Sequence, residues 1–121
     1  MKFSWCTITV NNMEESLNFY QEIVGLPMHQ RFSPRPDMDI SFLGDGETKI
    51  ELIHDPHHPA PGNVEGISIG FEVKSVDEMI NFIQEKGLQV ESGPFQPTPQ
   101  VKFFFVRDPN GVSVQFVEHI S

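Results

Sequence analysis

Apolar and polar residues alternate in several short stretches of the chain, and this period of two is typical of β-strands with one buried face. Residues 4–10 and 67–73 are two such stretches, and each is followed by apolar residues three or four positions apart. Spacing of that kind predicts a helix that buries one face. The pattern therefore predicts a strand followed by a helix, twice along the chain.

An internal repeat supports this division into halves. Residues 18–22, Asn-Phe-Tyr-Gln-Glu, recur at 81–85 as Asn-Phe-Ile-Gln-Glu, and each copy is soon followed by Gly-Leu. Both predicted helices also open on a capping box, which begins at Asn12 in the first half and at Ser75 in the second. Because the same local chemistry occurs at both places, we interpret the chain as a duplicated supersecondary unit.

Three further strands are expected in each half. They are predicted at residues 28–32, 39–43 and 48–53, and at residues 89–91, 101–107 and 112–118. Each half is then a βαβββ module, over about residues 1–56 and 64–121 of a single domain spanning 1–121. Residues 54–63 are rich in proline and lack apolar periodicity, so they are predicted to form a linker. The predicted fold class is α+β.

Side chains point alternately to the two faces of a strand, so each predicted strand divides into two columns. One column is apolar and is expected to pack under the helices. The other column consists of Trp5, Thr7, Thr9, Lys49, Glu51, Ile53, Ser68, Gly70, Glu72, Ser113, Gln115 and Val117. Pockets mix aromatic and polar side chains, so we interpret this column as the lining of a cavity. Exposure on an open, solvated sheet is the alternative.

Composition restricts the partners. The chain of 121 residues has a formal net charge of -9, which repels phosphate backbones and anionic lipid surfaces. We therefore expect no nucleic-acid partner and no membrane partner. The same charge would favour a cationic ligand in a cleft, although an acidic surface that only aids solubility is the preferred interpretation. The single cysteine, Cys6, cannot form an internal disulfide, and no apolar run is long enough to span a membrane. A soluble, cytoplasmic protein is expected.

Two sequence segments resemble a known family. They are the segment from Asn12-Met13 to Gly25-Leu26 and the ending from Asp108-Pro109-Asn110-Gly111 to Gln115-Phe116-Val117-Glu118. Together with the duplicated βαβββ module they resemble the vicinal oxygen chelate superfamily of glyoxalases, bleomycin-resistance proteins and ring-cleaving dioxygenases. The resemblance implies a glyoxalase-like curved mixed sheet with helices on the outer face. It also implies a homodimer.

The resemblance further identifies four positions at which glyoxalase I-like relatives hold a divalent metal. In this sequence they are Trp5, Glu51, Ser68 and Gln115. Only Glu51 is an ordinary metal ligand, because tryptophan has no suitable donor, serine is a poor one and the glutamine amide is neutral. We therefore predict that the family's metal site is not formed.

The leading hypothesis is a protein of the bleomycin-resistance type that binds a small molecule in the sheet cavity, without metal chemistry. Its predicted pocket consists of Trp5, Thr7, Glu51, Ser68, Gln115 and Phe104. The alternative is a metal-dependent enzyme of lactoylglutathione lyase type, with nickel or zinc and with Glu51 as a weak catalytic candidate. A purely structural protein that associates through the sheet is less favoured, because it leaves the polar column unexplained.

The linker also contains His54, His57 and His58. This composition is compatible with metal binding, but a flexible surface loop is the preferred interpretation, because metal ligands need supporting contacts that a loop rarely provides.

Overall fold

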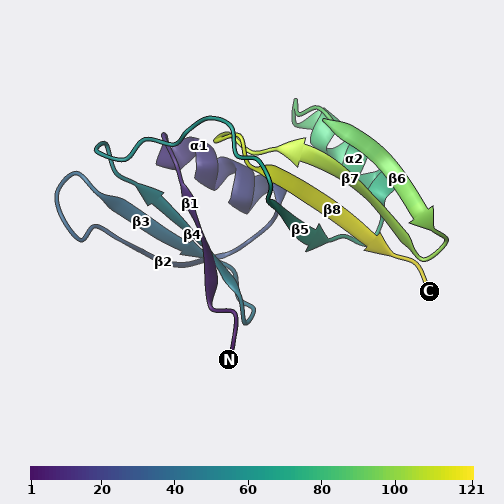
Figure 1. Ribbon diagram of the computed structural model, residues 1–121, viewed down its shortest axis with the longest axis horizontal. Helices are drawn as coiled ribbons and strands as arrows, with labels where there is room; N and C mark the ends of the chain where they lie inside the picture. The colour runs from purple at the N-terminus through teal and green to yellow at the C-terminus, as the bar shows by residue number, and fades with distance from the viewer. The chain divides into compact units, whose positions relative to one another are not determined.

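The computed structural model describes residues 1–121 and forms two compact units, Met1–Gly62 and Asn63–Ser121. Each unit contains one helical segment and four strands, and Figure 1 labels these elements along the chain. The strand and helix order is βαβββ in both units. The predicted duplication and the α+β fold class are therefore confirmed. Each unit is described by itself below.

The first unit is built on a four-stranded mixed sheet with strand order β1-β4-β3-β2. Its elements are β1 (Trp5–Thr9), α1 (Met13–Leu17), a π-helical turn η1 (Asn18–Ile23), β2 (Met28–Phe32), β3 (Asp39–Leu43) and β4 (Lys49–His54). Strand β1 runs parallel to β4, and the other neighbours are antiparallel. The parallel pair places the first and last strands of the module side by side at the centre of the site described below.

The first helix begins where the capping pattern predicts. The side chain of Asn12 accepts a hydrogen bond of 3.0 Å from the backbone N–H of Glu15, which satisfies one of the free donors of the first turn. The helix then widens into the π-helical turn and ends before Gly25, whose φ of 86° lies in the left-handed region. Glycine adopts this conformation without the strain that a side chain would cause.

The second unit repeats the arrangement, with strand order β5-β8-β7-β6. Its elements are β5 (Ser68–Glu72), α2 (Val76–Glu85), β6 (Ser92–Thr98), β7 (Val101–Arg107) and β8 (Ser113–His119). Strand β5 is parallel to β8, and the remaining pairs are antiparallel. The predicted cap at Ser75 is also confirmed, since its hydroxyl accepts a hydrogen bond from the backbone N–H of Glu78.

The strand predicted at 89–91 is wrong: the strand of this region is β6, from Ser92 to Thr98. The segment contains Pro94 and Pro97, which lack the N–H donor that a central strand needs. As the edge strand of its sheet, β6 pairs only with β7, and its register is interrupted on both sides of Phe95. An edge strand tolerates proline, and the sequence pattern does not reveal which strand lies at the edge.

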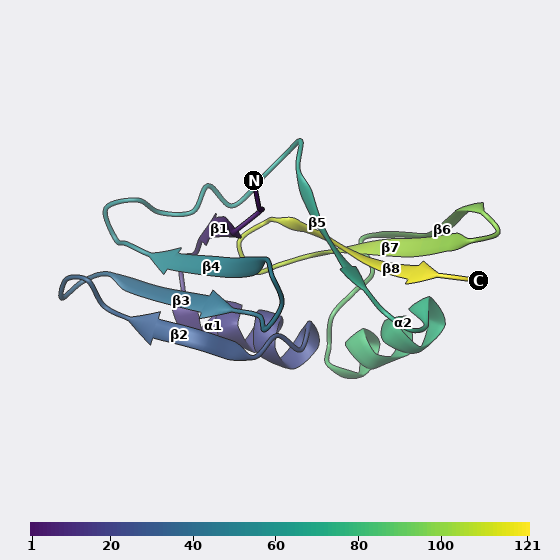
Figure 2. The ribbon, with the colours of Figure 1, turned by 90° about the horizontal axis from the view of Figure 1, so that it is seen from below.

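Each helix packs on one face of the sheet in its own unit, as Figure 2 illustrates. The apolar column predicted for the strands lies on this face, where Ile8, Leu52, Val114 and Phe116 are buried. The other face of each sheet is not covered by the helix of its own unit (Figure 1). We call these two faces the open faces of the first and second sheets.

The turn between β7 and β8 follows its sequence closely. Asp108 accepts hydrogen bonds of 2.8 Å from the backbone N–H groups of Asn110 and Val112. Gly111 has a φ of 84°, so the position requires glycine or a strained side chain. This turn fixes the register of β7 and β8, and with it the position of Gln115 opposite Phe105.

Candidate functional site

The open face of the first sheet carries a buried carboxylate. Strand register places Thr7, Glu51 and Phe42 in one row across β1, β4 and β3. The hydroxyl of Thr7 donates a hydrogen bond of 2.5 Å to Oε1 of Glu51. Glu51 is only 9% exposed, and Thr7 is the one hydrogen-bond partner of its side chain. Such a carboxylate has capacity left for a second donor, because its other oxygen accepts nothing from the protein.

Aromatic side chains surround this row. The ring of Trp5 meets the edge of Phe42 at a centroid distance of 5.3 Å, and Phe32 stacks on Phe42 at 6.5 Å. Trp5 is 52% exposed, so an indole surface is available beside Glu51. A shallow depression of about 330 Å³ opens next to this row, between Trp5, Phe42 and Lys49, and the carboxylate that lines it is Glu47, not Glu51. The combination of ring faces and one carboxylate suits a ligand that is both aromatic and cationic.

The second sheet has a corresponding row. Strand register aligns Gly70, Gln115 and Phe105 across β5, β8 and β7, in the positions that Thr7, Glu51 and Phe42 hold in the first sheet. A Cβ at Gly70 would lie 3.5 Å from Oε1 of Gln115, so the amide rests over this glycine. The duplication thus preserves the row but replaces a carboxylate with an amide.

Aromatic residues also flank the second row. Phe95, Phe103 and Phe105 form a cluster with centroid distances of 5.7 to 6.5 Å. Ser68 is exposed and pairs in register with Ser113 at one end of the strands. The open face of this sheet is therefore neutral and aromatic at its centre, whereas that of the first sheet holds a charge.

The structure separates the predicted pocket residues into two groups. Trp5, Thr7 and Glu51 lie together on the open face of the first sheet, and Ser68 and Gln115 lie on that of the second. Phe104 requires a correction. It is fully buried and contacts Phe116 at a centroid distance of 5.4 Å, on the helix-covered face.

The alternation of the strand explains the correction. Phe103 and Phe105 share the face of Val117 and Gln115, so these neighbours, not Phe104, present their rings on the open face. Phe42 and Phe32 were missed by the sequence analysis. They belong to strands that were predicted correctly, and extending the polar column to the third strand of the first half would have found Phe42.

The side chains at the four positions where the resemblance places metal ligands do not fit a divalent metal. In the first sheet one of these positions is occupied by the indole of Trp5, which cannot bind a metal, and the other, Glu51, accepts a hydrogen bond from a hydroxyl. Within the second sheet Ser68 and Gln115 supply neutral oxygens that bind divalent transition ions weakly. No step of chemistry through such an ion follows from these residues.

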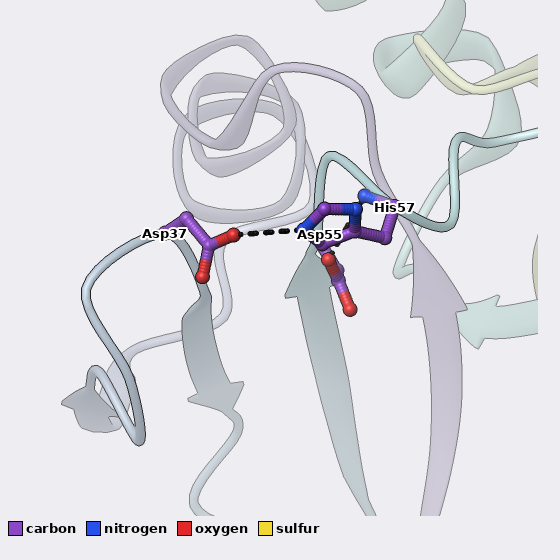
Figure 3. A group of neighbouring side chains, drawn as sticks. All are labelled: Asp37, Asp55 and His57. Atoms are coloured by element: carbon purple, nitrogen blue, oxygen red, sulfur yellow. Dashed lines mark hydrogen bonds and ion pairs between the residues drawn. The ribbon is translucent and has the colours of Figure 1, made fainter.

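A second group of polar side chains lies outside the sheet faces. Asp37, in the loop between β2 and β3, approaches Asp55 and His57, which follow β4 (Figure 3). Their ligand atoms all lie within 4.8 Å of one another. His57 Nε2 lies 3.1 Å from an Asp37 carboxylate oxygen, and Arg35 reaches both aspartates. We call these four residues the linker cluster.

The linker cluster changes the interpretation of the histidine-rich segment. Asp55 is 6% exposed, and the backbone N–H of His57, helped by the side chains of His58 and Arg35, lowers its pKa to about 2 although burial opposes this shift. Further along, the backbone N–H of Ala60 bonds to the side chain of Asn11 at 2.8 Å. The segment predicted to be a flexible surface loop thus makes specific contacts with other parts of the first unit.

Strand β1 also contains a thiol with a shifted pKa. Burial raises the pKa of the Cys6 thiol, which keeps it in the protonated, less reactive form. Cys6 belongs to the apolar column of β1, so this agrees with an inert packing role.

No helix of the protein combines the length and apolar character that crossing a membrane requires.

Comparison with known proteins identifies relatives over nearly the whole chain. A family model described as the Glyoxalase/Bleomycin resistance protein/Dioxygenase superfamily matches residues 2–116. A lactoylglutathione lyase from Neisseria meningitidis is 31% identical and is aligned over 98% of this chain and 91% of its own. A lactoylglutathione lyase from Haemophilus influenzae is 28% identical, over 94% of this chain and 90% of its own.

Solved structures share the fold at lower identity. A glyoxalase family protein from Enterococcus faecalis superposes with a TM-score of 0.77 at 24% identity, covering 97% of both chains. An antibiotic binding protein from Streptomyces sp. CB03234 has a TM-score of 0.77 at 23% identity, covering 98% of this chain and 96% of its own. Similarity at this level establishes the fold and leaves the activity to be argued from the site.

Proposed function

We propose, on the premise that the chain belongs to the Glyoxalase/Bleomycin resistance protein/Dioxygenase superfamily, that it binds a cationic aromatic small molecule without metal chemistry. The observation that carries this proposal is Glu51, a buried carboxylate with a single hydroxyl partner on an aromatic open face. A carboxylate that is largely withdrawn from water is stabilised by a cationic partner. A ligand ammonium or amidinium group supplies the missing partner.

The surroundings of Glu51 favour this ligand class. Phe42 pairs with Glu51 in register, and Trp5 contacts Phe42, so a ring of the ligand can lie against aromatic faces while its cation reaches the carboxylate. The net charge of -9 also attracts cations toward the protein. Among proteins of this fold, the one from Streptomyces sp. CB03234 is an antibiotic binding protein, which supports a small-molecule-binding role in this proposal.

Fluorescence of the only tryptophan tests the proposal directly. Trp5 lies beside the row, so binding of 1-naphthylmethylamine should quench or shift its emission, and the neutral analogue 1-naphthylmethanol should bind more weakly. A hydrogen bond to a charged group contributes about 1.5–3 kcal/mol, so Glu51→Gln should weaken binding of the amine about 10- to 100-fold. The alcohol should bind the variant and the original protein equally.

The matched control is Glu72→Gln, which removes the same charge from an exposed position in the second sheet. This variant should retain the preference for the amine. Equal affinity for amine and alcohol in the original protein would contradict the role of Glu51. Binding that leaves Trp5 emission unchanged would place the ligand away from the first open face.

The competing function is a lyase of lactoylglutathione lyase type, and the 31% identity to the Neisseria meningitidis protein of that name favours it. Glu51 would be its catalytic carboxylate, with nickel or zinc added to the protein. Conversion of the hemithioacetal to lactoylglutathione should then require the metal and disappear in Glu51→Gln. Metal-dependent turnover lost in this variant would replace the binding proposal with the enzyme.

A further inference from the structure

The linker cluster presents a set of metal donors that is separate from the row at Glu51. Asp37 and Asp55 offer carboxylate oxygens and His57 offers an imidazole nitrogen, all within 4.8 Å of one another. In Figure 3 the three side chains converge from the loop before β3 and the segment after β4. Two oxygens and one nitrogen are a donor combination that zinc and related transition ions accept.

The cluster already holds a cation. The guanidinium of Arg35 bridges the two carboxylates, with Nη2 2.6 Å from Asp55 Oδ2 and Nε 3.2 Å from Asp37 Oδ1. Both carboxylates therefore direct an oxygen at one positive group. The Arg35 side chain is about half exposed, so it can move into solvent when another cation replaces it.

The surroundings hold the buried donor in place. Asp55 accepts a backbone hydrogen bond of 3.0 Å from His57 and lies 3.1 Å from Nδ1 of His58. Contacts of this kind orient metal-ligating carboxylates and increase their affinity. A guanidinium can use only the two carboxylates of the cluster, whereas a transition ion can also use the imidazole of His57.

We propose that the linker cluster is a divalent transition-metal site, in which Zn²⁺ bound by Asp37, Asp55 and His57 displaces Arg35. Three protein ligands leave one position of a tetrahedral ion for water or for a ligand from outside. The bound ion would join the β2–β3 loop to the segment after β4. It would not involve Glu51, so the site is distinct from the proposed small-molecule site.

Calorimetric titration of the chelator-treated full chain with Zn²⁺ tests the proposal. Binding of one equivalent is expected, and His57→Gln and Asp37→Asn should each weaken it about 10-fold or more, since each removes a ligand. Arg35→Gln should strengthen binding, because it removes the competing cation. Asp37, Arg35 and His57 are exposed, so these variants are expected to fold.

Control variants separate this site from other zinc ligands. His29→Gln and His119→Gln remove exposed histidines elsewhere and should leave the affinity unchanged. Glu51→Gln should also leave it unchanged, which distinguishes the linker cluster from a metal held at the family position. Absence of binding in both the original protein and Arg35→Gln would overturn the proposal. Weaker Zn²⁺ binding by Arg35→Gln than by the original protein would also overturn it. So would Zn²⁺ binding that is lost in Glu51→Gln but retained in His57→Gln.

Discussion

Replacing Glu51 should stabilise the protein while removing its affinity for cations. The side chain is 9% exposed and has one hydrogen bond, from Thr7, in the structure. Desolvation of a carboxylate carries an effective penalty of several kcal/mol. One hydrogen bond to a charged group returns about 1.5–3 kcal/mol of this penalty. Because Glu51 keeps some exposure to solvent, we expect a residual destabilisation of at most about 1 kcal/mol, which the neutral amide in Glu51→Gln relieves.

The variant preserves the local geometry needed for this comparison. Its amide oxygen can still accept the hydrogen bond from the hydroxyl of Thr7, and the side-chain volume hardly changes. Urea unfolding followed by Trp5 fluorescence measures the effect. With a slope of about 1–2 kcal/mol per molar urea for a small protein, the midpoint should rise by up to about 1 M. Glu72→Gln, at an exposed position, should change the midpoint by much less.

The stabilisation that a bound ligand gives supplies a second comparison between the original protein and Glu51→Gln. The amine 1-naphthylmethylamine should stabilise the original protein in proportion to its affinity and concentration, and should stabilise Glu51→Gln much less. A fall in the unfolding free energy of Glu51→Gln, relative to the control, would show that the carboxylate is part of the structural framework. That result would refute the inference that Glu51 is kept for binding.

Three further predictions concern the framework. Phe104→Ala should lower the unfolding free energy by about 3–5 kcal/mol, because it empties a fully buried position, and Phe105→Ala should lower it clearly less in the same chemical denaturation series. The pKa of Asp55 lies near 2, below its ordinary value of 3.8, so its contribution to stability is present above about pH 4 and is lost as the pH falls toward 2. Asp55→Asn should therefore show a flatter loss of thermal stability over that interval, and an unchanged slope would contradict the assignment. Light scattering at micromolar concentration should give the mass of a homodimer, since each sheet ends in edge strands that can pair with another chain, and a strictly monomeric mass would contradict this prediction.

Local signals in the sequence were sufficient to predict most of the fold. Asn12 and Ser75 cap their helices as expected, because capping depends on residues only three positions apart. The alternation in β4 and β8 predicted which side chains face the helices. Strand β6 was misplaced because tolerance for Pro94 and Pro97 depends on its being an edge strand, and that is a property of the assembled sheet.

The sequence by itself also determined which polar group lies at the centre of each row, since Glu51 and Gln115 occupy equivalent places in a duplicated module. Only the tertiary structure decided how those groups are used. It buried Glu51 beside the hydroxyl of Thr7, and it brought Asp37 to His57, which lies twenty positions further along the chain. Such contacts arise from strand register and loop packing, which join residues distant in sequence, and periodicity along the chain carries no information about them.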